Sequence, residues 1–256
     1  MSSIPPPVLK RAFTKVTSAA DFSSSQFKKL LIVHKISRLT RFQRQGVLLQ
    51  PYVEKYYKQA LENAHTTHHS VISTFVEQAK KMGKEVVVVP EDELDHNAVL
   101  KDVCPETDMV VSMGGDHTFL RAQALIQDRR VPIMGINTCR EKFEGILNTQ
   151  YIDYDERLEH ATRLLEKVED ESAFTYEKRS RVLFEQLPST ESDEPPQRVL
   201  CLNETLCAEK DVSSASRYVV ERDGVNVGPF KSSGLVVSTG TGSTGWLYSV
   251  RQITPQ

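Results

Sequence analysis

The chain has 256 residues and a formal net charge of −2, and its apolar content is enough for one large domain or two smaller ones. The near-neutral charge argues against a general nucleic-acid-binding protein, and no apolar run approaches the roughly 18 residues that predict a membrane helix. None of its four cysteines, Cys104, Cys139, Cys201 and Cys207, forms a Cys-x-x-Cys pair. We therefore expect reduced thiols in an intracellular protein and no cysteine zinc site.

Residues 1–26 form a segment that we expect to be either disordered or a targeting sequence. Serines and basic residues, with no acidic residue before Asp21, are typical of a mitochondrial transit peptide. Pro5-Pro6-Pro7 would break an early helix and favours a disordered tail instead. The composition therefore leaves a mitochondrial and a cytoplasmic location open.

Short apolar runs and longer helical patterns alternate in the first half of the chain. Apolar residues recur at helical spacing from Val53 to Ala79, before Gly83, and a second amphipathic stretch covers Phe119–Ile126. Continuous apolar strands with helices between them indicate a parallel sheet that is covered on both faces, so its strands should be buried. The predicted strands are Leu30–Val33, Val86–Val89, Met109–Val111 and Val131–Ile136.

The pattern changes near residue 170. A helix is predicted over Asp155–Val168, and Asp223-Gly224 is typical of a hairpin turn. The strands expected beyond that helix are Thr175–Leu187, Val199–Ala208, Arg217–Glu221 and Ser233–Thr239, with a polar, proline-containing loop at residues 188–197. We therefore predict an α/β domain over residues 27–170 and a β-rich domain over residues 171–256.

A glycine-rich turn, Gly114-Gly115-Asp116-His117-Thr118, follows the third predicted strand. Glycine amides can hold phosphate, and Asp116 beside them could act as a general base in phosphoryl transfer to a hydroxyl. The plainer interpretation is a turn in which Asp116 caps the next helix. Asn137-Thr138 follows the fourth strand, and ligands of parallel sheets bind at the carboxyl ends of strands. Both segments are therefore candidates for one site.

Two further candidates lie in the β-rich half. Asn203-Glu204 interrupts an apolar strand, which would place the amide and the carboxylate on opposite faces, where ribose hydroxyls are suitable partners. The alternative is an edge strand with both groups in water. The segment Thr239–Trp246 is rich in glycine and hydroxyl groups and suits phosphate or ribose contacts, although a flexible loop has the same composition.

Three histidines, His65, His68 and His69, share one face of the long predicted helix. The spacing of His65 and His69 would suit zinc, but no acidic partner at ligand spacing is evident. We therefore interpret these histidines as an ordinary helix face and predict no metal site.

Three segments, Gly114–Thr118, Asn203-Glu204 and Thr241–Trp246, resemble in this order the motifs of the NAD kinase family. Gly135–Thr138 is similar to a further family segment, and the likeness runs from about residue 30 to about residue 250. The basic stretch Lys35–Arg41 and Trp246 look more like the mitochondrial branch of the family. The resemblance implies an α/β fold with an N-terminal Rossmann-like parallel sheet. It also implies a second, mostly β domain, which we expect to be incomplete after Gln256.

The family resemblance implies ATP-dependent phosphorylation of the 2′-hydroxyl of the adenosine ribose of NAD or NADH, with Mg²⁺ as the divalent cation. It also implies a homodimer or larger homo-oligomer and no nucleic-acid or membrane partner. Asp116 would be the catalytic residue that accepts the hydroxyl proton. The binding residues carried over by position are Gly114, Gly115, His117, Thr118, Asn137, Asn203, Glu204, Thr241, Gly242, Ser243, Thr244, Gly245, Trp246 and Ser249.

His117 stands where the family has glycine. A side chain there costs conformational freedom and space near the ligand, and it either donates to a phosphate or blocks the pocket. Two other functions stay open: a lipid or sugar kinase of the same superfamily, and a nucleotide-binding module that His117 or truncation makes inactive. The preference for NAD or NADH and the phosphoryl donor are also open.

Overall fold

The computed structural model describes residues 27–47, 51–95, 106–127, 131–139, 145–170, 173, 176–187, 197–211 and 213–251. The predicted N-terminal segment, Cys104 and most of the loop at 188–197 lie outside these residues. The chain divides between Tyr176 and Glu177 into two compact units, an α/β unit and a β-rich unit. None of the helices in the described ranges combines the length and apolar character that crossing a membrane requires.

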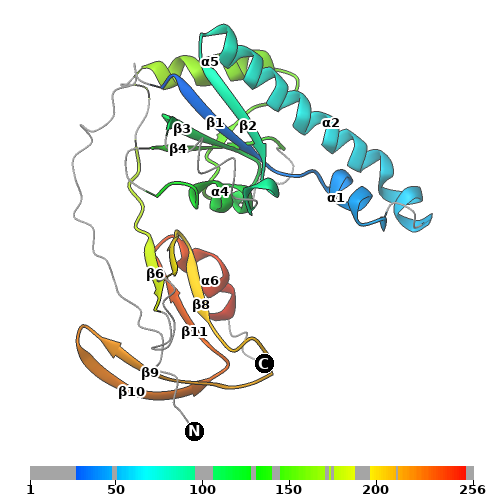
Figure 1. The fold of residues 1–256 in the computed structure, drawn as a ribbon. Coiled ribbons are helices and arrows are strands. Elements are labelled where there is room, and N and C mark those ends of the chain that lie inside the picture. The colour runs from blue at the N-terminus through cyan, green and yellow to red at the C-terminus, as the bar shows by residue number, and fades with distance from the viewer. Residues whose placement is uncertain are drawn as a thin grey trace. The chain divides into compact units, whose positions relative to one another are not determined.

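The α/β unit is built on a parallel sheet, as the sequence predicts, and this sheet has five strands (Figure 1). The order β2-β1-β3-β4-β5 places β3 in the centre, with β1 and β4 on either side of it. The short β5 was not predicted. The strands are β1 (Lys29–His34), β2 (Glu85–Pro90), β3 (Met109–Met113), β4 (Ile133–Asn137) and β5 (Gln150–Tyr151).

Among the described residues, four helices accompany this sheet. The helix α1 (Arg38–Arg44) begins where the Ser37 hydroxyl accepts a hydrogen bond from the Thr40 N–H. The helix α2 (Pro51–Lys81) has the predicted long pattern, and α4 (Asp116–Gln123) follows the glycine-rich turn. The last is α5 (Arg157–Glu169), and a short 3-10 turn, η4 (Glu93–Asp95), follows β2.

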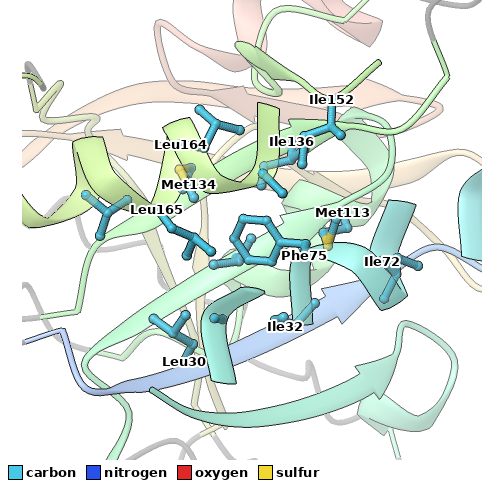
Figure 2. Close-up of a cluster of buried hydrophobic side chains, with 14 of the residues drawn as sticks. Leu30, Ile32, Ile72, Phe75, Met113, Met134, Ile136, Ile152, Leu164 and Leu165 are labelled. Atoms are coloured by element: carbon cyan, nitrogen blue, oxygen red, sulfur yellow. The ribbon is translucent and has the colours of Figure 1, made fainter. Parts of the chain in front are cut away.

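The side chains of the interior strand β1 alternate between the two faces of the sheet, so the strand contributes to a hydrophobic core on each face. Leu30 and Ile32 point to the face covered by α2 and α5, where Phe75 lies at the centre of the buried cluster (Figure 2). Leu31 and Val33 point to the other face, where they pack with Ala122 of α4. Because neighbouring strand residues face opposite sides, a strand with apolar residues throughout needs cover on both faces.

The strand β2 is less buried than the sequence predicts. Val87 and Val88 are 39% and 40% exposed. The prediction of a buried strand is wrong here because β2 lies at the sheet edge and, among the described strands, pairs only with β1. An apolar run by itself does not distinguish a central strand from an edge strand.

The described residues of the β-rich unit form three antiparallel strand pairs. β9 (Ser216–Arg222) and β10 (Val225–Ser232) form a hairpin whose turn residues Asp223 and Gly224 have φ of 55° and 80°, which confirms the predicted turn. The other pairs are β6 (Val182–Gln186) with β7 (Gln197–Cys201), and β8 (Glu204–Cys207) with β11 (Leu235–Ser238). A 3-10 turn, η7 (Gly242–Thr244), and the helix α6 (Trp246–Arg251) follow β11.

The strand predicted over Val199–Ala208 is two strands. β7 ends at Cys201 and β8 begins at Glu204, with a bend at Leu202 and Asn203 between them. Asn203 therefore does not lie within a strand, so the predicted placement of Asn203 and Glu204 on opposite faces of one strand is wrong. The two strands also pair with different partners, β6 and β11.

Candidate functional site

The glycine-rich turn lies at the carboxyl end of β3, in the middle of the sheet. The Gly114 N–H donates to the Ile136 carbonyl at 3.0 Å, which ties the turn to β4. A Cβ on Gly114 would lie 2.5 Å from the Thr118 hydroxyl oxygen, so a side chain does not fit there. Tight packing thus explains the first glycine, whereas Gly115 is exposed and has open space around it.

The carboxylate of Asp116 is held by a second loop of the α/β unit. It accepts hydrogen bonds from the N–H groups of Ile146, Leu147 and Asn148 at 2.8, 3.0 and 3.3 Å. A Cβ on Gly145 would collide with this carboxylate. The interpretation of Asp116 as a helix cap is wrong, because the N-cap of α4 is Gly115 and makes no side-chain cap bond. The turn after β3 and the loop 145–148 therefore fix the side chain of Asp116 together.

Glu91, directly after β2, is a buried acid that the sequence analysis did not single out. Its side-chain oxygens accept from the Thr118 hydroxyl at 2.8 Å and the Ile36 N–H at 3.3 Å. Glu91 is 4% exposed and its carboxylate lies 3.6 Å from the Arg41 guanidinium. It connects the ends of β1, β2 and β3. The available sign in the sequence was its position, because an acid directly after a strand of a parallel sheet lies at the ligand-binding edge.

His117 lies in the first turn of α4 and lines a cavity of about 360 Å³. Its backbone is helical and has no positive φ, so the side chain adds no strain of that kind. The same cavity is lined by Arg41 and Arg44 of α1 and by Arg121 of α4. His117 therefore extends the site toward a basic cavity.

Asn137 and Thr138 lie at the carboxyl end of β4, in the same unit as the glycine-rich turn. The Asn137 side-chain oxygen accepts from the Cys139 N–H at 2.8 Å, a local turn bond. The Thr138 hydroxyl lies 2.7 Å from His68 Nδ1, and His68 Nε2 lies 3.0 Å from the Lys35 carbonyl. Since a carbonyl only accepts, Nε2 carries the proton and Nδ1 accepts from Thr138. His68 thus joins the ends of β1 and β4 to α2.

The other two histidines of this helix face, His65 and His69, are neighbours of His68 in the structure. Burial, the Lys35 charge and the adjacent His34 and His69 lower the pKa of His68 to about 2. His65 Nδ1 lies 2.7 Å from the Ser37 hydroxyl at the start of α1. Among the described residues, no group of three or more His, Cys, Asp or Glu side chains could hold a metal ion.

In the β-rich unit, Asn203 and Glu204 are adjacent at the bend and the start of β8. Asn203 Oδ1 and Glu204 Oε2 are buried without a hydrogen-bond partner in the part of the chain that is described. Burial raises the pKa of Glu204. Unpartnered buried polar atoms are rare in folded proteins, so both groups are suited to accept hydrogen bonds from a ligand.

The loop after β11 is ordered around Asn203. The Thr239 N–H donates to the Asn203 carbonyl at 2.9 Å, and a Cβ on Gly242 would overlap the Asn203 backbone. The Ser243 and Thr244 hydroxyls donate to the loop carbonyls of Gly240 and Thr241. Arg179 donates to the Thr241 hydroxyl at 3.1 Å. The structure therefore brings the Asn203 bend and Thr239–Gly245 together, and the alternative of a flexible loop is not supported.

The predicted site residues thus form one group in each compact unit. Gly114, Gly115, Asp116, His117, Thr118 and Asn137 gather at the carboxyl edge of the parallel sheet. Asn203, Glu204 and Thr241–Gly245 gather at the bend before β8, whereas Trp246 is 46% exposed and Ser249 lies in α6. A glycine-rich turn and a carboxylate at the end of a central parallel strand define an α/β protein of the nucleotide-binding class.

Comparison with known proteins identifies the family within this class. The profile of the ATP-NAD kinase N-terminal domain matches residues 28–173. The chain therefore belongs to the NAD kinase family.

Individual relatives agree with the family assignment. An NAD kinase of Rhodococcus jostii is 31% identical over 179 residues, which is 70% of this chain and 52% of the relative. The rat protein named NAD kinase 2, mitochondrial, is 28% identical over 231 residues, covering 78% of this chain and 52% of its own length. The chain thus spans about half the length of these relatives. The crystal structure of yeast NADH kinase complexed with NADH has a TM-score of 0.56 at 14% identity, covering 96% of this chain and 68% of that one, and supports the fold.

Proposed function

We propose that this protein transfers the γ-phosphoryl group of ATP to the 2′-hydroxyl of the adenosine ribose of NAD or NADH, giving NADP or NADPH. The observation that carries the proposal is the position of Asp116, at the glycine-rich turn after the central strand of a NAD kinase family domain. Family membership favours the dinucleotide over a lipid or a sugar as the acceptor.

The residues of the α/β unit would act on the transferred group. The 2′-hydroxyl oxygen forms a bond to the γ-phosphorus, the bond from that phosphorus to the leaving ADP oxygen breaks, and Asp116 takes the hydroxyl proton. The exposed Gly115 lets phosphate approach the backbone, since nothing occupies the space where its Cβ would be. The loop N–H groups at residues 146–148 hold the Asp116 carboxylate in one orientation during this step.

The residues of the β-rich unit would hold the dinucleotide. The buried, unpartnered oxygens of Asn203 and Glu204 would accept hydrogen bonds from ribose hydroxyls or from the adenine or carboxamide edge. The segment Thr241–Trp246 and Ser249 would line the dinucleotide pocket, with the Asn203 bend as its rigid base.

The residues present fit a Mg²⁺ ion that arrives with the ATP phosphates. Sites of this kind hold Mg²⁺ through one or two carboxylates, substrate phosphates and water rather than through an all-protein cage. Asp92 Oδ1 is buried and has no hydrogen-bond partner among the described residues, and Asp92 lines the cavity beside His117. Bound Mg²⁺ would neutralise charge on the phosphate oxygens.

Membership of the mitochondrial branch is a finer proposal, with a mitochondrial location as its consequence. It rests on the stretch Lys35–Arg41 and Trp246, and on similarity to the rat mitochondrial protein over 78% of the chain. Expression of the whole chain fused at its C-terminus to a fluorescent protein tests the location directly, because an uncleaved cytosolic fusion would contradict it. Assembly as a homodimer or larger oligomer is likewise proposed, and sedimentation measures it.

Asp116→Asn tests the catalytic assignment. The substitution should reduce NADP formation at least about 1,000-fold, since the proton acceptor is lost, while leaving NAD affinity within about threefold. The introduced amide would face the N–H groups of loop 145–148, so a thermal melt is needed to show that the variant is folded. Full turnover in a folded variant would overturn the role of Asp116. Parallel assays with NAD, NADH and a diacylglycerol decide between dinucleotide and lipid kinase.

A second candidate function, an inactive nucleotide-binding module, is favoured by one observation: His117 replaces a glycine of the family motif. If His117 blocks the reaction, wild-type protein binds NAD without turnover and His117→Gly gains activity. If His117 serves the reaction, wild-type protein is active and His117→Gly is slower.

A further inference from the structure

The loop 145–148, which holds the Asp116 carboxylate, also packs tightly on β4. A Cβ on Gly135 of β4 would lie 2.5 Å from Asn148 Oδ1 and 2.8 Å from Asn148 Cα. On the other side of the loop, a Cβ on Gly145 would collide with the Asp116 carboxylate. The loop therefore touches both the strand and the carboxylate, and each of these contacts requires a glycine.

The side chain of Asn148 lies between the carboxylate and the strand, and it is 1% exposed. Its Nδ2 lies 3.5 Å from Asp116 Oδ1, at the long limit of a hydrogen bond. Because an ionised carboxylate only accepts hydrogen bonds, the amide turns its NH2 group toward Asp116 and its oxygen toward β4. Asn148 Oδ1 is buried there and has no hydrogen-bond partner among the described residues. One end of the amide is thus committed to Asp116, and its other end is an unused acceptor.

Ser112 of β3 has the complementary unused group. Ser112 and Gly135 are register partners in neighbouring parallel strands, so their Cβ directions share the face of the sheet on which Asn148 lies. Ser112 is fully buried, and its hydroxyl has no partner in the part of the chain that is described. Buried polar groups are nearly always paired, directly or through a buried water. The Ser112 hydroxyl is therefore suited to donate to the Asn148 oxygen by one of these two routes.

The two oxygens of the Asp116 carboxylate receive unequal numbers of donors. Oδ1 accepts from the N–H groups of Leu147 and Asn148 and from Asn148 Nδ2. Oδ2 accepts from the Ile146 N–H at 2.8 Å and from no other described residue. Since each carboxylate oxygen has two lone pairs, Oδ1 is fully used by the loop, whereas Oδ2 keeps one lone pair for a ligand.

We propose that Asn148 is a positioning residue for phosphoryl transfer. Its amide, oriented by Ser112, occupies Asp116 Oδ1 and so presents Oδ2 to the acceptor hydroxyl. The hydroxyl proton moves to Oδ2 as the hydroxyl oxygen bonds to the γ-phosphorus and the bond from that phosphorus to the leaving ADP oxygen breaks. Asn148 is buried behind the carboxylate and touches no substrate. The inference rests on the proposed function, because it explains how the proposed base is oriented.

Asn148→Leu separates the amide donor from the volume of the side chain. Leucine has a similar branched shape, and the oxygen that it removes is buried without a described partner, so the variant should be nearly as stable as the wild type in a thermal melt. The kcat for NADP formation should nevertheless fall about tenfold, while the KM values for NAD and ATP stay within about twofold, because only the orientation of the base changes. An unchanged kcat in the folded variant would overturn the proposal.

Gln123→Met is the matched control. Gln123 is a buried amide of the same unit, its side-chain oxygen also lacks a described partner, and its NH2 group donates to the Leu120 carbonyl rather than to Asp116. Methionine keeps most of the volume and removes the amide, as leucine does for Asn148. This variant should keep kcat and both KM values within about twofold of the wild type, and a loss of kcat equal to that of Asn148→Leu would overturn the specific role of Asn148.

Ser112→Ala tests whether the serine acts through Asn148. It should lower kcat about two- to threefold in the wild-type background and cause no further loss in Asn148→Leu, because no amide remains for the hydroxyl to orient. Equal losses in both backgrounds would overturn the part assigned to Ser112.

Side-chain amide resonances of the full chain give a readout that does not depend on turnover. The NH2 signals of Asn148 should shift in Asp116→Asn, because the charge that they face is removed, whereas those of Gln123 should stay in place. Normal NADP formation by the wild type without this shift would overturn the positioning role alone. The shift in a protein whose wild type makes no NADP would support the contact and overturn the proposed function alone.

Discussion

His68 shows how one buried side chain links the site to the stability of the protein. Its ring bridges the Lys35 carbonyl and the Thr138 hydroxyl, and it is 1% exposed. The bridge uses the neutral ring, because Nδ1 accepts a hydrogen bond and a protonated ring could not. Protonation would therefore break the contact that holds the end of β4.

We expect His68 to make folding pH-dependent. Its pKa is lowered, mainly by burial, to about 2 in the folded protein, against about 6.5 in the unfolded chain. Below about pH 6.5 the unfolded state binds a proton that the folded state does not, so the free energy of unfolding falls as pH falls, by up to about 1.4 kcal/mol per pH unit. The stabilisation is complete above that pH and is lost below it.

Urea unfolding of wild-type protein and His68→Gln between about pH 7 and about pH 5 measures this effect. Glutamine keeps polar atoms at this position and does not titrate, so the variant should be less stable at neutral pH but lose stability less steeply on acidification. His69, whose pKa burial also lowers, is retained in both proteins and its contribution cancels. Equal slopes in the two proteins would contradict the assignment.

Two glycines of the loop after β11 allow a matched pair of alanine substitutions, one at a crowded position and one in open space. A Cβ on Gly242 would overlap the Asn203 backbone, whereas a Cβ on Gly240 would meet nothing within 4 Å, and neither glycine has a positive φ. We expect Gly242→Ala to cost about 1–3 kcal/mol and to weaken NAD binding, because it displaces Asn203. Gly240→Ala should leave both the melting temperature and the NAD affinity nearly unchanged. Similar effects of the two substitutions would contradict the close packing of this loop on Asn203.

At the scale of whole elements, patterns within short stretches of sequence predicted the positions of individual strands and helices. The strands β1, β3 and β4 and the helix α2 were found because apolar runs and helical spacing are visible within short windows. The exposure of Val87 and Val88 was not predicted, because it depends on which strands pair and in what order. Sheet order is a long-range property that an apolar run does not contain.

The features of the candidate site also divide into those that local sequence predicts and those that depend on distant segments. Asp116, His117 and Asn203 could be named from motifs, whereas their contacts come from segments far along the chain. Loop 145–148 holds Asp116 across about 30 residues, and Glu91 reaches Thr118 across 27. Nothing periodic marks an acid such as Glu91 or the break between β7 and β8 at Asn203. The motifs therefore named candidate residues, whereas Glu91 and the structural partner of each candidate were not predicted.

The second half of helix α2 packs into the hydrophobic core, whereas the first half is largely exposed. Phe75 is fully buried against both β1 and α5, whereas Tyr56, on the same helix, is 60% exposed. Phe75→Ala should lower the free energy of unfolding by about 3–5 kcal/mol, because it leaves a large cavity in the core. Tyr56→Ala should cost less than about 1 kcal/mol. Chemical denaturation compares the two, and equal losses would mean that the first half of α2 packs against something in solution.

For the molecule as a whole, overall charge and local charge give different information. A net charge of −2 argues against a general polyanion-binding surface, yet Arg41, Arg44 and Arg121 line one cavity. Their grouping depends on the fold, because α1 and α4 are about 80 residues apart in sequence, yet residues of both helices line this cavity. Composition therefore bounds the type of partner, and the fold decides where a charged ligand is able to bind.

The division into two compact units makes a further prediction about folding. Both buried clusters, the one around Phe75 and the one around Leu31, consist entirely of residues between Phe27 and Tyr176. The unit Thr17–Tyr176 thus contains its own cores on both faces of the sheet, and a domain on the order of 150 residues buries enough surface to fold alone.

A fragment spanning Thr17–Tyr176 should therefore show a cooperative thermal transition by circular dichroism and dispersed amide resonances. The same fragment with Phe75→Ala is the internal control, and its transition should move to lower temperature because the substitution empties the centre of the larger core. A gradual melt with collapsed resonances in the unsubstituted fragment would mean that the α/β unit requires the rest of the chain to fold. A cooperative melt would mean that the sheet edge carrying Asp116 is formed by this unit on its own.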